Sequence, residues 1–210
     1  SVGTANGVLL GVGGDFDGQG QLSLPGGATS GADPVSGYVD LPNHIINVLT
    51  NLTIETWVTY EAPAASAWQR IFDFGTSAGG EDIVNGDGAY LFLTPEGSAN
   101  LRFAVRDPVT ASEIVQLTSS APLPTGKEIF LAVTYNFDGN VTKLYSNAVV
   151  VATDTADTEL KGIDDVNNWL GRSQWNDAMF QGKYNEFRIY DGAKSDEEIQ
   201  AAMKIGRAHV

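Results

Sequence analysis

Short apolar runs separated by glycine-rich turns fill most of this chain, and this spacing restricts its fold more than any other feature. Glycine accounts for 24 of the 210 residues, about 11% against the usual ~7%, and the glycines fall between the runs. Short apolar runs bounded by turn residues are typical of β-strands. The pattern predicts strands at residues 37–41, 52–60, 70–74, 90–94, 100–106, 113–117, 128–135, 142–145, 149–153, 169–173 and 183–190.

Alternating polarity assigns the two faces of these strands. In residues 52–59, Leu52, Ile54 and Val58 point one way, and Glu55 and Trp57 point the other way, because successive strand side chains alternate. Residues 90–93 and 129–135 are instead apolar on both faces, which indicates central strands.

Only one segment reads as a helix. Ser195 with Glu198 three residues later forms a capping box, and Ile199, Ala202 and Met203 then make one apolar stripe. Many strands and one terminal helix predict an all-β fold, a two-sheet antiparallel jelly-roll sandwich with a short C-terminal helix. Residues 1–204 are expected to form a single domain, in which the glycine-rich residues 1–36 are its loop-like leading segment.

Composition excludes several classes of protein. With 12 Lys and Arg against 26 Asp and Glu, the net charge is −14, which disfavours nucleic acid and anionic membrane surfaces as partners. No apolar run approaches the roughly 20 residues of a membrane helix. Cysteine is absent, and His44 and His209 are the only histidines, so the chain has almost no material for a Ser-His-Asp triad or a zinc site.

A series of ordered motifs carries a family resemblance. "GYVDLP" at 37–42, "LTIETWV" at 52–58, "WQRIFDFG" at 68–75 and "YLFLTP" at 90–95 are followed by "LRFAVRD", "IFLAVTYN", "NWLGRSQW" and "FQGKYNEFRIYDGAKSDEEI". Over residues 8–204 the chain resembles the laminin-G-like jelly-roll domain of the concanavalin-A-like lectin/glucanase group. The resemblance implies two antiparallel sheets, a concave face, and a carbohydrate- or protein-binding module of a secreted or surface protein, frequently with a structural calcium.

The chain departs from that family at four places. Asn185 stands where the family usually has Asp, and Asn147-Ala148 replaces a frequent Asp-Gly turn. The family's opening apolar strand is expected before Ser1. The end, "IGRAHV" at 205–210, resembles a translated sequencing adaptor and is expected to be a non-native tail that packs against nothing. The chain is therefore expected to be a fragment of a larger protein with covalently linked neighbouring domains.

Paired carboxylates are the signature of glycoside hydrolases, which belong to the same fold group. Retaining enzymes place the two groups about 5–5.5 Å apart on one face. The nearest candidate, Glu81-Asp82, has adjacent carboxylates in a loop-like segment, and adjacent strand residues would point in opposite directions. The sequence therefore predicts a protein that is not an enzyme.

Calcium is the cofactor that the sequence allows. Asp15 and Asp17 offer oxygens at alternate positions of a glycine-rich loop, which suits a hard cation. The loops at 164–165 and 81–82 offer equally plausible carboxylates. The alternative interpretation is that these are solvated turns, so no metal-binding residue is assigned.

Arginine and tryptophan on predicted strands suggest where a ligand binds. Sugars need charge-assisted hydrogen bonds to their hydroxyls and an aromatic plane beneath their C–H face. The candidate polar contacts are Arg70, Asp73, Arg102, Arg172 and Gln174, and the candidate stacking residues are Trp68 and Trp175. The alternative is that Arg and Asp neutralise one another across neighbouring strands and that the tryptophans are core.

These observations favour a non-catalytic recognition module for carbohydrate or a surface glycoprotein, located outside the cell or on its surface. A structural or adhesion spacer that binds protein and a glycoside hydrolase of the same fold group are the alternatives. An exposed aromatic platform on one sheet would favour sugar binding. A sheet filled with mutually paired charges would favour the spacer, and two facing carboxylates in a cleft would favour the enzyme.

Overall fold

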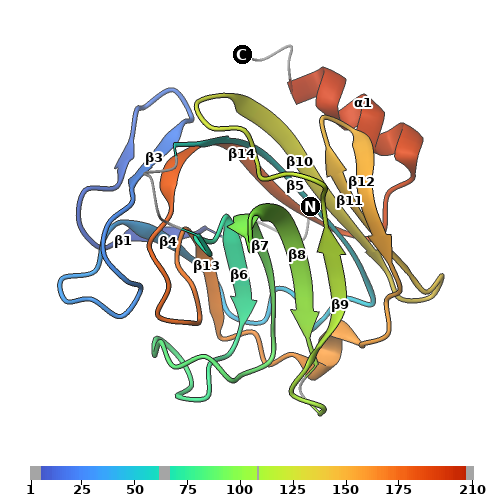
Figure 1. Cartoon of the computed structure of the whole chain (residues 1–210), viewed down its shortest axis with the longest axis horizontal. Coiled ribbons are helices and arrows are strands. Elements are labelled where there is room, and N and C mark those ends of the chain that lie inside the picture. Colours follow the sequence, from blue (N-terminus) through green and yellow to red (C-terminus); the bar gives the residue numbers. More distant parts are fainter. Residues whose placement is uncertain (1–5, 62–66, 108, 207–210) are drawn as a thin grey trace.

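The computed structural model describes residues 6–61, 67–107 and 109–206, which form two seven-stranded antiparallel sheets and one C-terminal α-helix (Figure 1). The first sheet has the order β1 (Val8–Leu10), β4 (Tyr38–Leu41), β13 (Asn167–Leu170), β6 (Phe72–Gly75), β7 (Tyr90–Gly97), β8 (Asn100–Arg106) and β9 (Glu113–Thr118). The second sheet has the order β12 (Val149–Asp154), β11 (Val141–Ser146), β10 (Glu128–Asn136), β5 (Asn51–Tyr60), β14 (Gln181–Asp191), β3 (Leu22–Pro25) and β2 (Asp15–Phe16). The predicted all-β sandwich with a terminal helix is confirmed.

The leading segment differs from the prediction that it is a loop. Residues 8–10, 15–16 and 22–25 form the strands β1, β2 and β3 at the edges of the two sheets. They are only two to four residues long and are separated by glycine-rich turns. Such strands are too short to show an alternation of polar and apolar residues in the sequence. Leu22 and Leu24 are nevertheless buried in the main core.

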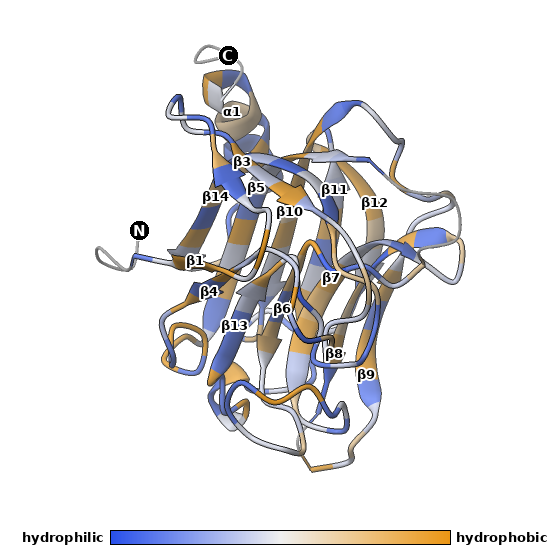
Figure 2. Ribbon diagram, turned by 90° about the vertical axis from the view of Figure 1, so that its left-hand side faces the viewer, coloured by the Kyte–Doolittle hydropathy of each residue, from blue (hydrophilic) through white to orange (hydrophobic). Residues whose placement is uncertain are grey.

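The core lies between the two sheets and follows the alternation of each strand, which Figure 2 shows as alternating bands of hydropathy. On β5, Leu52, Ile54 and Val58 point inward and are at most 1% exposed. They meet aromatic side chains of the first sheet such as Phe72 and Phe103, which are fully buried. Dense packing of large side chains between the two sheets provides the main stabilisation of the fold.

The outer face of the second sheet is covered by α1 (Asp196–Gly206) (Figure 1). The capping box forms as predicted, because Ser195 N donates to Glu198 Oε2 at 2.8 Å and Glu198 N donates to Ser195 Oγ at 3.3 Å. Ile199 and Ala202 pack against an aromatic cluster centred on Trp57. The helix includes Ile205 and Gly206, which were expected to belong to an undocked tail.

Gly206 is buried against Trp57, and a Cβ at this position would collide with the indole Nε1. The expectation that the tail touches nothing is therefore wrong for Gly206. The rest of the expected tail, 207–210, lies outside the described residues.

The position of β13 determines what covers the outer face of the first sheet. This strand comes late in the sequence yet lies between β4 and β6, pairing Trp169 with Asp40 on one side and with Asp73 on the other. The segment that follows it, residues 171–180, therefore starts in the middle of the first sheet. It is this segment that builds most of the site described next.

Candidate ligand-binding site

The residues predicted to bind a ligand gather on the outer face of the first sheet. Asp73 lies on β6 opposite Phe92 of β7, and Arg102 lies on β8 opposite Thr94. Trp68 and Arg70 precede β6, and the segment after β13 supplies Arg172, Gln174 and Trp175. The sequence prediction therefore brought together residues that share one face, although they differ greatly in exposure.

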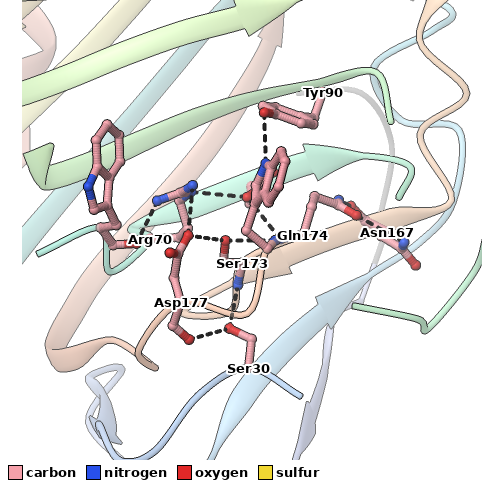
Figure 3. Close-up of polar contacts among 10 residues, drawn as sticks. Ser30, Arg70, Tyr90, Asn167, Ser173, Gln174 and Asp177 are labelled. Carbon is pink, nitrogen blue, oxygen red and sulfur yellow. Dashed lines mark hydrogen bonds and ion pairs between the residues drawn. The ribbon is translucent and has the colours of Figure 1, made fainter. Parts of the chain in front are cut away.

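A buried ion-pair network occupies the centre of this face (Figure 3). Arg70 Nε donates to Asp73 Oδ2 at 3.1 Å, and Arg70 NH2 lies 3.1 Å from Asp177 Oδ2. The backbone N–H of Gln174 donates to the same Asp73 oxygen at 3.1 Å. Arg70 is 2% exposed and Asp73 is completely buried, so neither can meet a ligand without movement of the overlying segment.

Burial also changes the acidity of Asp73. Removal from water raises the pKa of its carboxyl to about 7, and the nearby Arg70 guanidinium opposes this shift only in part. The second carboxylate oxygen, Oδ1, is buried without a hydrogen-bond partner. The face therefore holds a carboxyl that changes charge near neutral pH.

Segment 171–180 is fixed to the sheet by side-chain amides. Gln174 Nε2 donates to the backbone oxygen of Asn167 at 3.0 Å, and Asn167 Nδ2 donates back to Gln174 Oε1 at 3.1 Å (Figure 3). Ser173 Oγ donates to Asp177 Oδ2 at 2.9 Å, and its backbone N–H donates to Ser30 Oγ at 3.1 Å. The segment thus has a fixed conformation, and Gln174, completely buried, serves to hold it.

Four arginines place their guanidinium groups over aromatic rings of the same face. The guanidinium carbon of Arg70 is 4.2 Å from the centroid of the Phe92 ring, and that of Arg106 is 5.8 Å from the Tyr90 ring. Arg102 lies 5.7 Å from the Trp68 ring and forms an ion pair with Glu113. Such stacking pairs a delocalised cation with the negative face of a ring.

Arg172 is the fourth stacked arginine, farther along the sheet. It contacts the Tyr38 ring at 4.7 Å and the Trp169 ring at 4.3 Å, and donates to Tyr38 Oη at 3.0 Å and to the backbone oxygen of Ser30 at 3.2 Å. Its 8% exposure leaves little of the guanidinium accessible. These contacts are those of a structural residue.

The two tryptophans chosen for stacking are the accessible ones. Trp175 is 36% exposed and donates its indole N–H to Tyr90 Oη at 2.8 Å. Trp68 is half-buried, has a positive φ of 69° and meets Phe92 edge-on at 6.4 Å. In contrast, Trp57 and Trp169 are 4% and 0% exposed, as expected for residues within strands.

Sequence reasoning missed several residues that complete this face. Tyr90 and Phe92 form the aromatic floor on β7, with ring centroids 5.8 Å apart, and Asp177 closes the ion-pair network. The spacing of two residues between Tyr90 and Phe92 was visible in the sequence. Because residues 90–93 are apolar on both faces of the strand, the pattern did not show which of the two faces is the outer one. The role of Asp177 depends on the path of segment 171–180, which no local pattern predicts.

Three of the carboxylates expected to bind calcium, Asp17, Glu81 and Asp165, lie in separate loops and accept hydrogen bonds there. Asp165 Oδ2 accepts from Ile46 N at 2.8 Å, Asp17 Oδ1 accepts from Gln19 N at 2.7 Å, and Glu81 Oε1 accepts from Asn43 Nδ2 at 2.6 Å. Within the described ranges, no group of three or more His, Cys, Asp or Glu is placed to hold a metal ion.

The two carboxylates that do meet on the sheet are Asp73 and Asp177, which share Arg70 between them. A glycosidase pair flanks an open cleft, whereas this pair is bridged by a cation and covered by segment 171–180.

No helix in the described part of the chain has the length and hydropathy to cross a membrane.

Three solved structures of similar fold were determined with a bound sugar. Domain 4 of AbnA, an extracellular arabinanase of Geobacillus stearothermophilus solved with arabinotriose, matches with a TM-score of 0.69 at 19% identity, covering 93% of this chain and 86% of that one. The Ruminococcus gnavus sialidase CBM40 bound to sialyllactose matches with a TM-score of 0.65 at 16% identity, covering 93% and 98%. The ligand-binding domain of botulinum neurotoxin serotype D, solved with N-acetylneuraminic acid, has a TM-score of 0.66 at 15% identity, covering 95% of this chain but 46% of that one.

These identities are low enough that the likeness concerns the fold alone. A comparison with curated protein sequences gave no match. The family profile Laminin_G_3, described as the concanavalin A-like lectin/glucanases superfamily, matches residues 31–200. Since this match spans most of both sheets, the chain belongs to the Laminin_G_3 family of concanavalin A-like lectin/glucanase domains.

Proposed function

We propose that this domain is a non-catalytic carbohydrate-recognition module whose site lies on the outer face of the first sheet, between Trp68 and Trp175. The observation that carries the proposal is that the two accessible tryptophans of this face flank the aromatic floor made by Phe92 and Tyr90. A sugar can stack its C–H face on such a surface. Rigid aromatic side chains also lose little entropy on binding.

The polar part of the proposed site comes from the rim of the arginine layer. Arg102 and Asp177 retain side-chain exposures of 16% and 26%, so both can reach sugar hydroxyls from the edge of the platform. Arg70, Asp73, Arg172 and Gln174 lie beneath this surface. Their proposed role is to hold the platform in place, which revises the sequence-based assignment of these four residues as direct contacts.

The comparisons support the ligand class without identifying the ligand. The arabinanase domain, the CBM40 module and the toxin domain were each solved with a sugar. We extend this by analogy of fold to the present chain, together with a location outside the cell. A structural calcium ion remains part of the proposal and is tested by chelation.

The test is a glycan array probed with residues 1–210 in calcium and again in chelator, followed by calorimetry with the best ligand. The array includes arabino-oligosaccharides and sialylated glycans. Trp175→Ala should weaken binding about five- to thirty-fold while preserving the unfolding transition, because stacking of a ring on a ligand contributes about 1–2 kcal/mol. Phe16→Ala is the matched control, since Phe16 is 55% exposed and lies on β2 of the other sheet. Equal losses in both variants, or no glycan binding at all, would refute the proposed site.

A structural or adhesion module that binds protein is the second candidate. It is favoured by the mutual pairing of charge on the same face, where Arg70 pairs with Asp73 and Asp177 and where Arg106 pairs with Asp87. A blank array together with a stable, cooperatively folded domain would give this candidate first place.

A further inference from the structure

Three ion pairs on the outer face of the first sheet share one order of burial, in which the carboxylate is more exposed than the guanidinium. The pairs, with the side-chain exposures of the arginine and the acid, are Arg70–Asp177 at 3% and 26%, Arg102–Glu113 at 16% and 24%, and Arg106–Asp87 at 11% and 66%. The cations of this face therefore lie beneath its anions. A ligand that approaches the face meets carboxylates first.

These three acids, Asp87, Glu113 and Asp177, form an acidic rim beside the aromatic platform. Each is held there by the arginine with which it pairs. The guanidinium groups that pair with Asp177 and Glu113 both lie 5.7 Å from the ring of Trp68, and the one that pairs with Asp87 lies 5.8 Å from the ring of Tyr90. A sugar stacked on the platform therefore has carboxylates within reach next to both rings.

The acidic rim offers hydrogen-bond acceptors to such a ligand. Asp177 binds both Arg70 and the hydroxyl of Ser173 through Oδ2 (Figure 3). Asp87 and Glu113 likewise pair with their arginines through one oxygen each, Oδ1 and Oε2. The other oxygen of each carboxylate is the one left for a ligand. Because an ionised carboxylate accepts hydrogen bonds and donates none, the ligand must supply the donor, as a sugar hydroxyl does.

An anionic ligand finds no such partner. Its own carboxylate cannot donate to the acidic rim, and like charges brought together at an interface weaken binding. The net charge of −14 adds to this repulsion. The arginines that could attract an anion are already neutralised or buried. Arg102 and Arg106 pair with the rim, and Arg172, 8% exposed, donates to Tyr38 Oη and Ser30 O.

We propose that this site selects uncharged, hydroxyl-rich glycans and excludes glycans that carry a carboxylate, sulfate or phosphate group, because its acidic rim lies above its arginines. The inference rests on the proposed function, since it concerns the ligand of the same site. The acidic rim then determines specificity. The arginines beneath it, which alone would suggest an acidic sugar, hold the rim and the platform in place.

The first test compares two ligands of nearly equal size. The neutral glycan that binds best on the array is measured by calorimetry beside the same glycan with one terminal primary hydroxyl oxidised to a carboxylate. The oxidised glycan should bind about ten-fold or more weakly at low salt. Raising the salt from about 0.05 M to about 0.5 M should narrow this difference, because charge repulsion is screened. Loss of a hydroxyl contact alone would give a difference that salt does not change.

The second test removes charge from the acidic rim. Asp87→Asn/Glu113→Gln leaves two arginines of the platform without counterions, so the oxidised glycan should bind about ten-fold or more tightly than to the wild type. The neutral glycan should bind a few-fold more weakly, because an amide oxygen is a poorer acceptor than a carboxylate. Asp191→Asn/Glu197→Gln is the matched control with the same charge change, at exposed positions on β14 and α1, on the side of the second sheet. It should leave the preference unchanged, and cooperative thermal unfolding confirms that both variants are folded.

The outcomes separate this inference from the proposed function. Wild-type protein that binds the oxidised glycan as tightly as the neutral one, or whose best ligand on the array is anionic, would overturn the exclusion of anions while the sugar-binding module stands. A folded rim variant with the preference of the wild type would overturn it as well. A blank array refutes the proposed function and this inference together.

Discussion

Trp175 donates its indole N–H to the phenol oxygen of Tyr90 at 2.8 Å, which ties the most exposed tryptophan of the chain to a strand in the middle of the first sheet. The other support of the indole is Gly86, where any Cβ would overlap the ring. A loop side chain thereby acquires the rigidity of a strand residue. Preorganised aromatic groups bind with less loss of entropy.

Tyr90→Phe should therefore weaken glycan binding without removing an aromatic ring. The loss of one hydrogen bond, about 0.5–1.5 kcal/mol, corresponds to a reduction in affinity of roughly two- to ten-fold. Calorimetry with the ligand from the array measures it, and the fluorescence of Trp175 should shift as the indole becomes more mobile. An affinity equal to that of the wild type would show that the position of Trp175 does not depend on Tyr90.

Arg172→Ala should destabilise the domain. The variant removes a buried guanidinium from between Tyr38 and Trp169 and leaves Tyr38 Oη and Ser30 O without its hydrogen bonds. We expect the unfolding free energy to fall by about 2–4 kcal/mol, as for other buried hydrogen-bonded groups. Urea denaturation measures this change. Arg172→Lys keeps the charge but loses the flat stacking, so it should recover only part of the stability. A fully stable Arg172→Ala protein with impaired ligand binding would return Arg172 to the set of direct contacts.

Stability should rise as the pH is lowered through the titration of Asp73. The pKa of this carboxyl is about 7 in the folded state, against an ordinary value of 3.8. Between these two values the folded state binds more protons than the unfolded state. The unfolding free energy therefore increases as the pH falls from about 7 to 3.8. This gain in stability is lost again as the pH rises back through 7.

Asp73→Asn isolates this effect. The amide keeps an acceptor for Gln174 N and leaves Arg70 paired with Asp177, so the fold should persist. Denaturation of both proteins at several pH values gives the slope of the unfolding free energy against pH for each. Carboxyls with lowered pKa values, such as Asp107 and Asp196, contribute equally to both slopes, so their effect cancels in the difference. Identical slopes would show that Asp73 is ionised throughout this range.

The turn at Asn147-Ala148 should carry removable strain. Both residues adopt positive φ, 49° and 60°, which costs an L-residue with a Cβ about 1–2 kcal/mol. Ala148→Gly should therefore raise the unfolding free energy by about 0.5–1 kcal/mol, after the greater chain entropy of glycine is deducted. Thermal and urea unfolding provide the measurement. Ala152→Gly, in the adjacent strand β12, should lower stability instead, and a stabilisation of both variants would contradict the explanation by positive φ.

The sequence could predict the long strands, the helix and the faces of the strands, because each depends on a local period. The replacement of an Asp-Gly turn by Asn147-Ala148 was visible in the sequence, and the structure shows that Ala148 adopts positive φ there. In the hairpin at residues 136–140, the sequence Asn-Phe-Asp-Gly-Asn favours positive φ at Gly139. The structure shows positive φ at Asn140 instead, at 47°, a conformation that asparagine tolerates well.

The candidate site could be predicted only in part. Trp68, Arg70, Asp73 and Trp175 do share one sheet face, but their burial depends on segment 171–180, whose course is set by contacts with Ser30 and Asn167. Such contacts join residues more than a hundred positions apart as well as near neighbours. No periodicity records them, so Arg70 and Arg172 looked like surface hydrogen-bonding groups although both are buried.

The place of β13 and β14 in the two sheets has a consequence for how the chain acquires its structure. β13 fills the gap between β4 and β6, and β14 fills the gap between β5 and β3. During synthesis, neither sheet can be continuous until its late strand, β13 or β14, has left the ribosome. Folds that depend on such distant pairings form slowly. A chain truncated before residue 167 should therefore be held as an aggregation-prone intermediate in which each sheet is split into two parts. The addition of β13 and β14 then commits the nascent protein to its native state.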